Sequence, residues 1–214
     1  MTTVRIWFTK TKEASYISLL DLQRLMQRCI KRSGLPVWYT QGFNPHIYIT
    51  FACPLPLGQE SLVESLDVKT EDSQVDLEHW KQTLEKLMPL GLEITKVTLP
   101  VHKAEQIGFA TYTLEFPLYA KNSLDAYNEL EHAVVQKKAK RGFKEIDLKE
   151  SLSKFEYEQT EHGIRVTVKL PAGDGLNLNP SLWLQFLASE FGLNTTEVSV
   201  LRTGLLLKNG EQFC

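Results

Sequence analysis

The chain has 214 residues, of which 43% are hydrophobic and 23% are charged, with a formal net charge of −2. These values are typical of a globular protein and argue against a disordered or fibrous chain. No apolar run approaches the ~20 residues that cross a bilayer, and the first residues lack the apolar core of a signal peptide. The sequence therefore predicts a cytoplasmic protein that does not bind membranes.

Three cysteines, Cys29, Cys53 and Cys214, show no spacing typical of zinc or iron–sulfur ligation. We therefore expect no metal site and no cofactor. Charge is unevenly distributed: residues 1–50 hold seven Lys or Arg against two acids, and residues 51–100 hold four against nine. This asymmetry predicts a molecule with one basic face.

The first half of the chain alternates predicted strands and helices. Residues 4–9 alternate apolar and polar side chains, as in a half-buried strand. Ser18 and Asp21 form the capping box of a helix, and Gly34 ends it. The remaining predicted elements are strands at 37–40, 46–51, 65–70 and 92–99 and a helix at 77–88.

The second half repeats this order with strands at 111–119, 143–148, 164–170 and 198–207, helices at 123–136 and 181–191, and an extended stretch at 151–159. Ser123 and Asn179 are the predicted helix caps. Two successive β-α-β-β-α-β patterns predict an α+β fold of two ferredoxin-like (split βαβ) units with antiparallel sheets, at 1–100 and 101–214. The first half has one strand too many for this fold.

A loop in the first half concentrates polar and aromatic side chains. Its residues are Gln41, Gly42, Phe43, Asn44 and His46, preceded by an aromatic residue and tightened by a proline. Such groups suit stacking on, and hydrogen bonding to, a planar ligand or a base. The alternative is that the turn is purely structural, with the phenylalanine in the core and the histidine at a strand end.

Two basic clusters are candidates for binding phosphate. Arg24, Arg28 and Arg32 recur every four residues along one helix face, and we expect Arg5, Lys10, Lys12 and Lys31 to extend this surface. The second cluster, at 137–144, includes Lys140 and Arg141. For both clusters the alternative is an ordinary solvated surface.

No catalytic signature is present in the sequence. The five histidines are scattered without a partner at a readable spacing, and no Ser-His-Asp or Cys-His pattern occurs. The catalytic residues are therefore unknown, and binding is favoured over catalysis.

Several segments resemble the bacterial radical-SAM-linked protein family. They are Ser18-Leu19-Leu20-Asp21-Leu22, Gly34-Leu35-Pro36, Gln41-Gly42-Phe43-Asn44-Pro45-His46 and Pro54-Leu55-Pro56-Leu57-Gly58. The similarity extends more loosely through residues 64–68, 90–92 and 146–149 to Arg202. Leu19 stands where family members commonly have histidine, which argues against acid–base chemistry at the helix start.

The resemblance implies an accessory role beside a radical-SAM protein, with RNA as a further partner. It implies one site formed by Asp21, the 41–46 loop and residues 54–58. In this site the loop would bind a base, and Arg24 and Arg28 would hold phosphate. The function predicted from the sequence is a non-catalytic binding module. The alternatives are an RNA-processing enzyme similar to the CRISPR repeat endoribonucleases, with His46 as acid or base, and a protein-interaction subunit that docks through the 54–57 loop.

Overall fold

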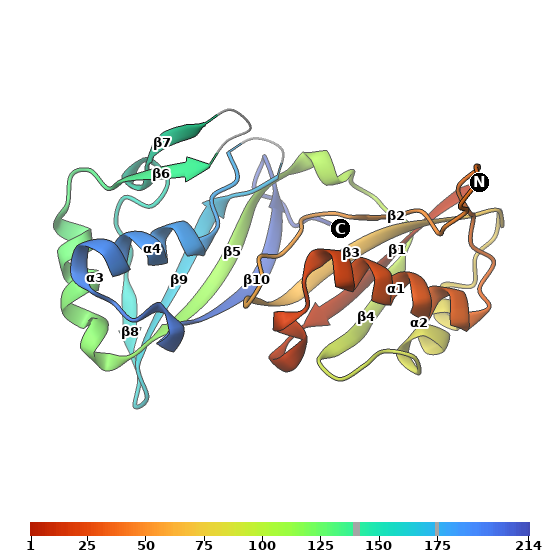
Figure 1. Ribbon diagram of the computed structural model, residues 1–214, viewed down its shortest axis with the longest axis horizontal. Helices are drawn as coiled ribbons and strands as arrows, with labels where there is room; N and C mark the ends of the chain where they lie inside the picture. Colours follow the sequence, from red (N-terminus) through yellow and green to blue (C-terminus); the bar gives the residue numbers. More distant parts are fainter. Residues whose placement is uncertain (139–141, 174–175) are drawn as a thin grey trace. The chain divides into compact units, whose positions relative to one another are not determined.

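The computed structural model describes residues 1–138, 142–173 and 176–214 (Figure 1). The protein has a mixed α/β fold in which the strand pairs are mostly antiparallel. It divides into two compact units, of which the first comprises residues 1–107 with 212–214 and the second comprises residues 108–211. Among the described residues, no helix is both long enough and apolar enough to span a bilayer.

The first unit has the element order β-α-β-β-α-β. Its elements are β1 (Thr2–Lys10), α1 (Leu19–Ser33), β2 (Ile49–Phe51), β3 (Glu60–Thr70), α2 (Leu77–Glu85) and β4 (Leu92–Thr98). The strands lie in the order β4-β1-β3-β2, and each neighbouring pair is antiparallel. Helices α1 and α2 cover one face of this sheet (Figure 1).

Alternation along β1 decides which side chains form the core of the first unit. Val4, Ile6 and Phe8 are buried toward the helices. The apolar face of α1, which includes Leu22 and Met26, packs into the same core. The intervening β1 residues point to the opposite face of the sheet, because successive side chains alternate.

The extra strand predicted at 37–40 is wrong. This segment makes only single bridges, between Val37 and Thr70 and between Tyr39 and Ile47. Pro45 has no N–H to donate to a ladder, and the chain loops outward at 41–45, so regular pairing begins only at Ile49. The helix capped by Ser18 is confirmed, and it ends at Gly34, which adopts the left-handed conformation.

The second unit also has an antiparallel sheet. Its elements are β5 (Ile107–Phe116), α3 (Lys121–Glu129), β6 (Val134–Lys138), β7 (Phe143–Asp147), β8 (Tyr157–Gln159), β9 (Ile164–Pro171), α4 (Pro180–Phe191) and β10 (Ser199–Leu207). The strand order is β10-β5-β9-β8, and β6 and β7 form a separate hairpin. Trp183 on α4 packs edge to face on Phe116 and Phe155 in the core.

Two helix predictions in this unit had different outcomes. Asn179 caps α4 as expected, since its side chain accepts a hydrogen bond from the Ser181 N–H. The predicted helix at 123–136 is wrong in both its start and its end, because α3 starts at Lys121 and ends at Glu129. The β-branched residues at 134 and 135 pair with β7 instead, where tertiary pairing outweighs a local helical pattern.

Candidate functional site

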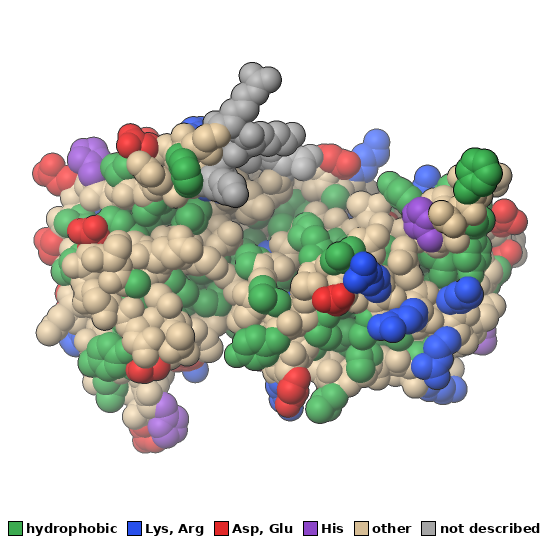
Figure 2. Space-filling view, in the orientation of Figure 1, with side chains coloured by type: hydrophobic (Ala, Val, Ile, Leu, Met, Phe, Trp, Pro, Cys, Tyr) green, Lys and Arg blue, Asp and Glu red, His purple; other side chains and the backbone are tan. Residues whose placement is uncertain are grey.

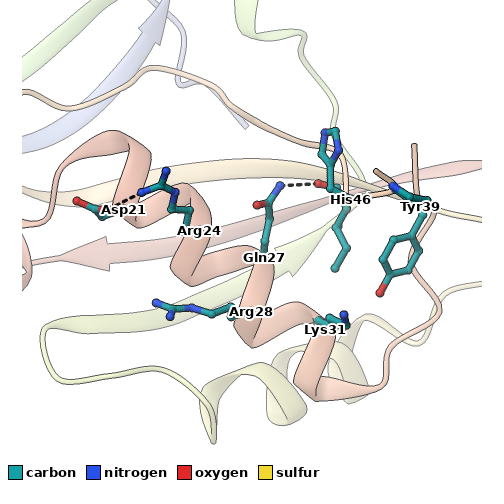
Figure 3. A pocket seen from close by; sticks show the side chains of 9 residues that line it. Asp21, Arg24, Gln27, Arg28, Lys31, Tyr39 and His46 are labelled. Carbon is teal, nitrogen blue, oxygen red and sulfur yellow. Dashed lines mark hydrogen bonds and ion pairs between the residues drawn. The ribbon is translucent and has the colours of Figure 1, made fainter. Parts of the chain in front are cut away.

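An open pocket lies between α1 and the extended segment at 39–47. It has a volume of about 550 Å³, and we call it the α1 pocket. Its lining residues are Asp21, Arg24, Gln27, Arg28, Lys31, Tyr39, Pro45, His46 and Ile47. Figure 3 shows that the labelled side chains come from one face of the helix and from the neighbouring extended segment.

The helical side of the α1 pocket is cationic. Spacings of three and four residues place Asp21, Arg24, Arg28 and Lys31 on one face of α1. Arg24 pairs with Asp21 at 3.4 Å, but both side chains are more than 60% exposed, so solvent weakens this attraction. Arg28 and Lys31 have no carboxylate partner within ion-pair distance in the described ranges. Lys and Arg side chains accordingly gather over α1 in Figure 2.

Hydrogen bonds hold the opposite wall of the α1 pocket. The Thr40 N–H donates to the His46 carbonyl at 2.9 Å, and the His46 N–H donates to Thr40 Oγ1 at 3.1 Å. Gln27 Nε2 donates across the pocket to the buried Ile47 carbonyl at 2.8 Å. The backbone of this wall is therefore fixed both to itself and to the helix.

The loop between these hydrogen bonds extends into solvent. Phe43 is fully exposed, so the alternative that it fills the core is wrong. Gly42 has φ of 137°, which L side chains rarely adopt, and its surroundings are open. Glycine is needed here for backbone conformation and not for space. Gln41 and Asn44 are also exposed.

The α1 pocket contains only part of the predicted site. Asp21, Arg24, Arg28 and His46 line it together. Gln41, Gly42, Phe43 and Asn44 belong to the same loop but lie outside the lining, as do residues 54–58. Lys140 and Arg141 lie outside the described residues.

The sequence singled out neither Gln27 nor Ile47, which also line the pocket. Lys31 was expected to extend the basic surface, and Tyr39 and Pro45 to belong to the polar and aromatic loop; all three line the pocket. Lys31 carried a usable signal, because it follows Arg28 by three positions and Arg24 by seven on the same helix face. Gln27 carried none, since its role depends on a carbonyl 20 residues away in the sequence.

Two of the cations expected to extend the basic surface are buried instead. Arg5 is 0% exposed and binds both carboxylate oxygens of Asp67, at 2.7 and 2.8 Å. Lys10 is 1% exposed, and its Nζ donates to the Ser15 carbonyl. Both side chains are buried because their charged ends have partners: the Arg5 guanidinium also lies 4.6 Å from the Phe213 ring, and Lys10 Nζ reaches the turn at Ser15.

The α1 pocket is suited to binding an anion. Its charged lining consists of three cations and one carboxylate. The nearest cysteine, Cys29, is buried on the other side of α1, and burial raises the pKa of its thiol despite the opposing effect of Arg32 and Arg28. Within the described parts of the chain, no three His, Cys, Asp or Glu side chains gather as metal ligands.

The fold and the pocket thus define an α/β protein with a cationic site on a helix face. A family model described as "uncharacterized protein conserved in bacteria (DUF2344)" matches residues 3–180. The chain belongs to this family. A search of curated proteins finds no match.

Proposed function

We propose that this protein is a non-catalytic accessory module that binds RNA and presents it to a radical-SAM protein. In this proposal the α1 pocket holds RNA phosphates through Arg24, Arg28 and Lys31. The observation that carries it is the set of three cations on one helix face, two of which have no ion-pair partner among the described side chains. Phosphate would supply the missing counter-charge.

Aromatic side chains beside the α1 pocket support a nucleic-acid ligand over a simple anion. Tyr39 lines the pocket and is 39% exposed, and Phe43 projects fully into solvent from the adjoining loop. Exposed rings next to cations suit single-stranded RNA, whose bases stack on aromatic faces while its backbone contacts basic groups. We propose that Phe43 stacks on a base while Gln41 and Asn44 hydrogen-bond its edge.

We also propose that the two units are ferredoxin-like, with a change-over at residues 100–101. Strand order β4-β1-β3-β2 in the first unit and β10-β5-β9-β8 in the second supports this interpretation. The hairpin β6–β7 would then be an insertion in the second unit. In the structure the boundary between the two compact units falls after residue 107, seven residues later in the sequence than this proposed division.

The radical-SAM partner is proposed from the motifs at 18–22, 41–46 and 54–58. An exposed apolar group near the start of α1 supports a protein contact. Leu57 is 63% exposed, Leu19 42% and Leu20 55%, and the Gly58 N–H bonds the Ser15 carbonyl just before the helix. Leu57→Asp should abolish co-elution with a radical-SAM protein of the same bacterium in size-exclusion chromatography but leave RNA binding unchanged.

RNA binding is tested by fluorescence anisotropy with a labelled single-stranded RNA. We expect Arg28→Ala/Lys31→Ala to weaken binding at least tenfold, and Phe43→Ala to weaken it about tenfold through lost stacking. Arg32→Ala is the matched control, because it removes a charge from the same helix outside the α1 pocket. Equal losses in the control and in the double variant would contradict a site at the α1 pocket.

A catalytic alternative rests on the position of His46. Its Nδ1 lies 3.1 Å from Thr40 Oγ1 and 3.2 Å from the Asn44 carbonyl oxygen, which orients the ring, and His46 lines the α1 pocket together with the cations. An oriented imidazole near bound phosphate is the arrangement that a general base in RNA cleavage needs. Incubation of RNA with the parent and with His46→Ala decides between the two: cleavage that His46→Ala abolishes favours an enzyme, and intact RNA with both favours a binding module.

A further inference from the structure

A second pocket in the first unit lies on the sheet face opposite the helices. It has a volume of about 670 Å³, within the range of small-molecule sites. Alternation places Arg5 of β1, Asp67 and Lys69 of β3 and Thr50 of β2 on this face, and Tyr48, just before β2, extends it. Residues 100–105 form its other side. We call it the sheet-face pocket.

The floor of the sheet-face pocket is rigid and electrically neutral. Arg5 binds Asp67 through two parallel hydrogen bonds and donates a third, at 3.2 Å, to the Cys214 carbonyl. Its guanidinium also lies 4.6 Å from the centre of the Phe213 ring. A bidentate pair that is fully buried on the arginine side stays in place when a ligand arrives, so the floor is pre-organised.

The walls of the sheet-face pocket carry a positioned cation and an exposed ring. Lys69 Nζ lies 5.7 Å from the Trp38 ring centre and 5.4 Å from the Tyr48 ring centre, which restrains the ammonium. No carboxylate in the described ranges lies within ion-pair distance of Lys69 or of Lys103, which also lines the pocket. Tyr48 is 45% exposed, so its ring remains available to another planar group.

We propose that the sheet-face pocket binds a nucleoside monophosphate. The base stacks on Tyr48, and Lys69 and Lys103 hold the phosphate from two sides. The Thr50 hydroxyl donates or accepts hydrogen bonds at the base or ribose, and the outer lone pairs of the Asp67 carboxylate accept them. This site uses none of the residues of the α1 pocket, so it is independent of the proposed RNA-binding function.

Isothermal titration calorimetry at low salt tests this site with AMP, GMP, CMP and UMP separately, each beside its own nucleoside and beside inorganic phosphate. We expect at least one monophosphate to bind with Kd below about 1 mM and at least tenfold more tightly than its nucleoside or phosphate alone. Tyr48→Ala and Lys103→Ala should each weaken that binding about tenfold. Both side chains are exposed, so both variants should keep the parent's melting temperature.

Two control variants locate the binding. Tyr16→Ala removes another exposed tyrosine of the same unit, and Arg28→Ala removes a cation of the α1 pocket; both should bind the monophosphate like the parent. Loss of binding in Arg28→Ala with retention in Tyr48→Ala would assign the ligand to the α1 pocket and overturn the proposal. Equal affinity for phosphate alone, or no binding of any monophosphate, would overturn it as well.

Discussion

Gln27 is the side chain that connects the two sides of the α1 pocket. It lies on the helix between Arg24 and Arg28, and its Nε2 donates to the carbonyl of Ile47, a residue only 3% exposed. Without this donor the buried carbonyl would lose its hydrogen-bond partner on the helix. Gln27 therefore positions the pocket wall and is not required to touch a ligand.

Gln27→Ala should lower the free energy of unfolding by about 1 kcal/mol, because a buried carbonyl loses a hydrogen bond. Urea denaturation followed by circular dichroism measures this change. Gln23→Ala is the matched control, since it removes the same side chain from the same helix outside the pocket lining. Equal destabilisation by the two variants would show that the contact with Ile47 contributes nothing specific.

A second residue-scale feature is the pair formed by His132 and Asp147 at the base of the β6–β7 hairpin. His132 Nδ1 lies 2.6 Å from Asp147 Oδ2, while Asp147 Oδ1 accepts the Ala133 N–H. The hydrogen bond to Asp147 and its negative charge raise the pKa of His132. A raised folded-state pKa means that the pair stabilises the protein fully below the histidine's ordinary pKa, and that this stabilisation is lost as pH rises through the folded-state pKa.

Asp147→Asn should therefore lower the pKa of His132 toward that of a free histidine, about 6.5. Titration of the His132 ring protons by NMR gives this value directly. The parent should also lose some thermal stability as pH rises above about 6.5 and through the folded-state pKa of His132, whereas Asp147→Asn should lose less. A His132 pKa that is the same in parent and variant would contradict the assigned cause.

The residues of the α1 pocket were partly predictable from sequence. Arg24, Arg28 and Asp21 share a helix face by spacing alone, and that face was foreseen. His46 was identified from its loop, but only the bridge between Tyr39 and Ile47 brings it next to the helix. Such a contact depends on pairing between separate segments, and the spacing of residues within one helix or strand does not predict that pairing.

At the scale of elements, α1 organises the candidate site, and its amino-terminal cap overlaps with the pocket. Ser18 Oγ accepts the Asp21 N–H at 3.2 Å and donates to Asp21 Oδ2 at 2.7 Å. The carboxylate that accepts a hydrogen bond from the capping serine is thus the one that pairs with Arg24. Asp21 therefore contacts both the residue that caps α1 and a cation of the α1 pocket.

Ser18→Ala should destabilise the protein by about 1 kcal/mol, whereas Ser18→Asn should be close to neutral because asparagine caps a helix equally well. Chemical denaturation of the three proteins gives both values. If Ser18→Asn were destabilised as much as Ser18→Ala, the Ser18 hydroxyl would contribute through something other than the cap.

Elements with strong local signals were predictable, and those determined by distant pairing were not. The strand at β1, the capped start of α1 and the cap of α4 follow from alternation and from side chains that bond the nearest N–H groups. The end of α3 does not, because residues 134–138 pair with 143–147 across a turn. The same reason explains the isolated bridges at Val37 and Tyr39.

At the scale of the whole molecule, the near-neutral total charge conceals local asymmetry. The chain carries a net −2, yet the charged lining of the α1 pocket has three cations against one acid. A local cationic site on a neutral protein predicts binding that is specific to one surface and that releases few counterions. The number of counterions released is therefore the quantity that links the proposed RNA function to these residues.

The most direct test of the RNA-binding proposal is the salt dependence of affinity for a labelled single-stranded RNA, compared between the parent and Arg28→Ala/Lys31→Ala. For single strands the slope of log affinity against log salt is about −0.7 per phosphate contact, so the loss of two contacts should flatten it by about 1.4. Arg32→Ala should keep the slope of the parent. Parallel slopes for the parent and the double variant, or no RNA binding at low salt, would contradict a phosphate site in the α1 pocket.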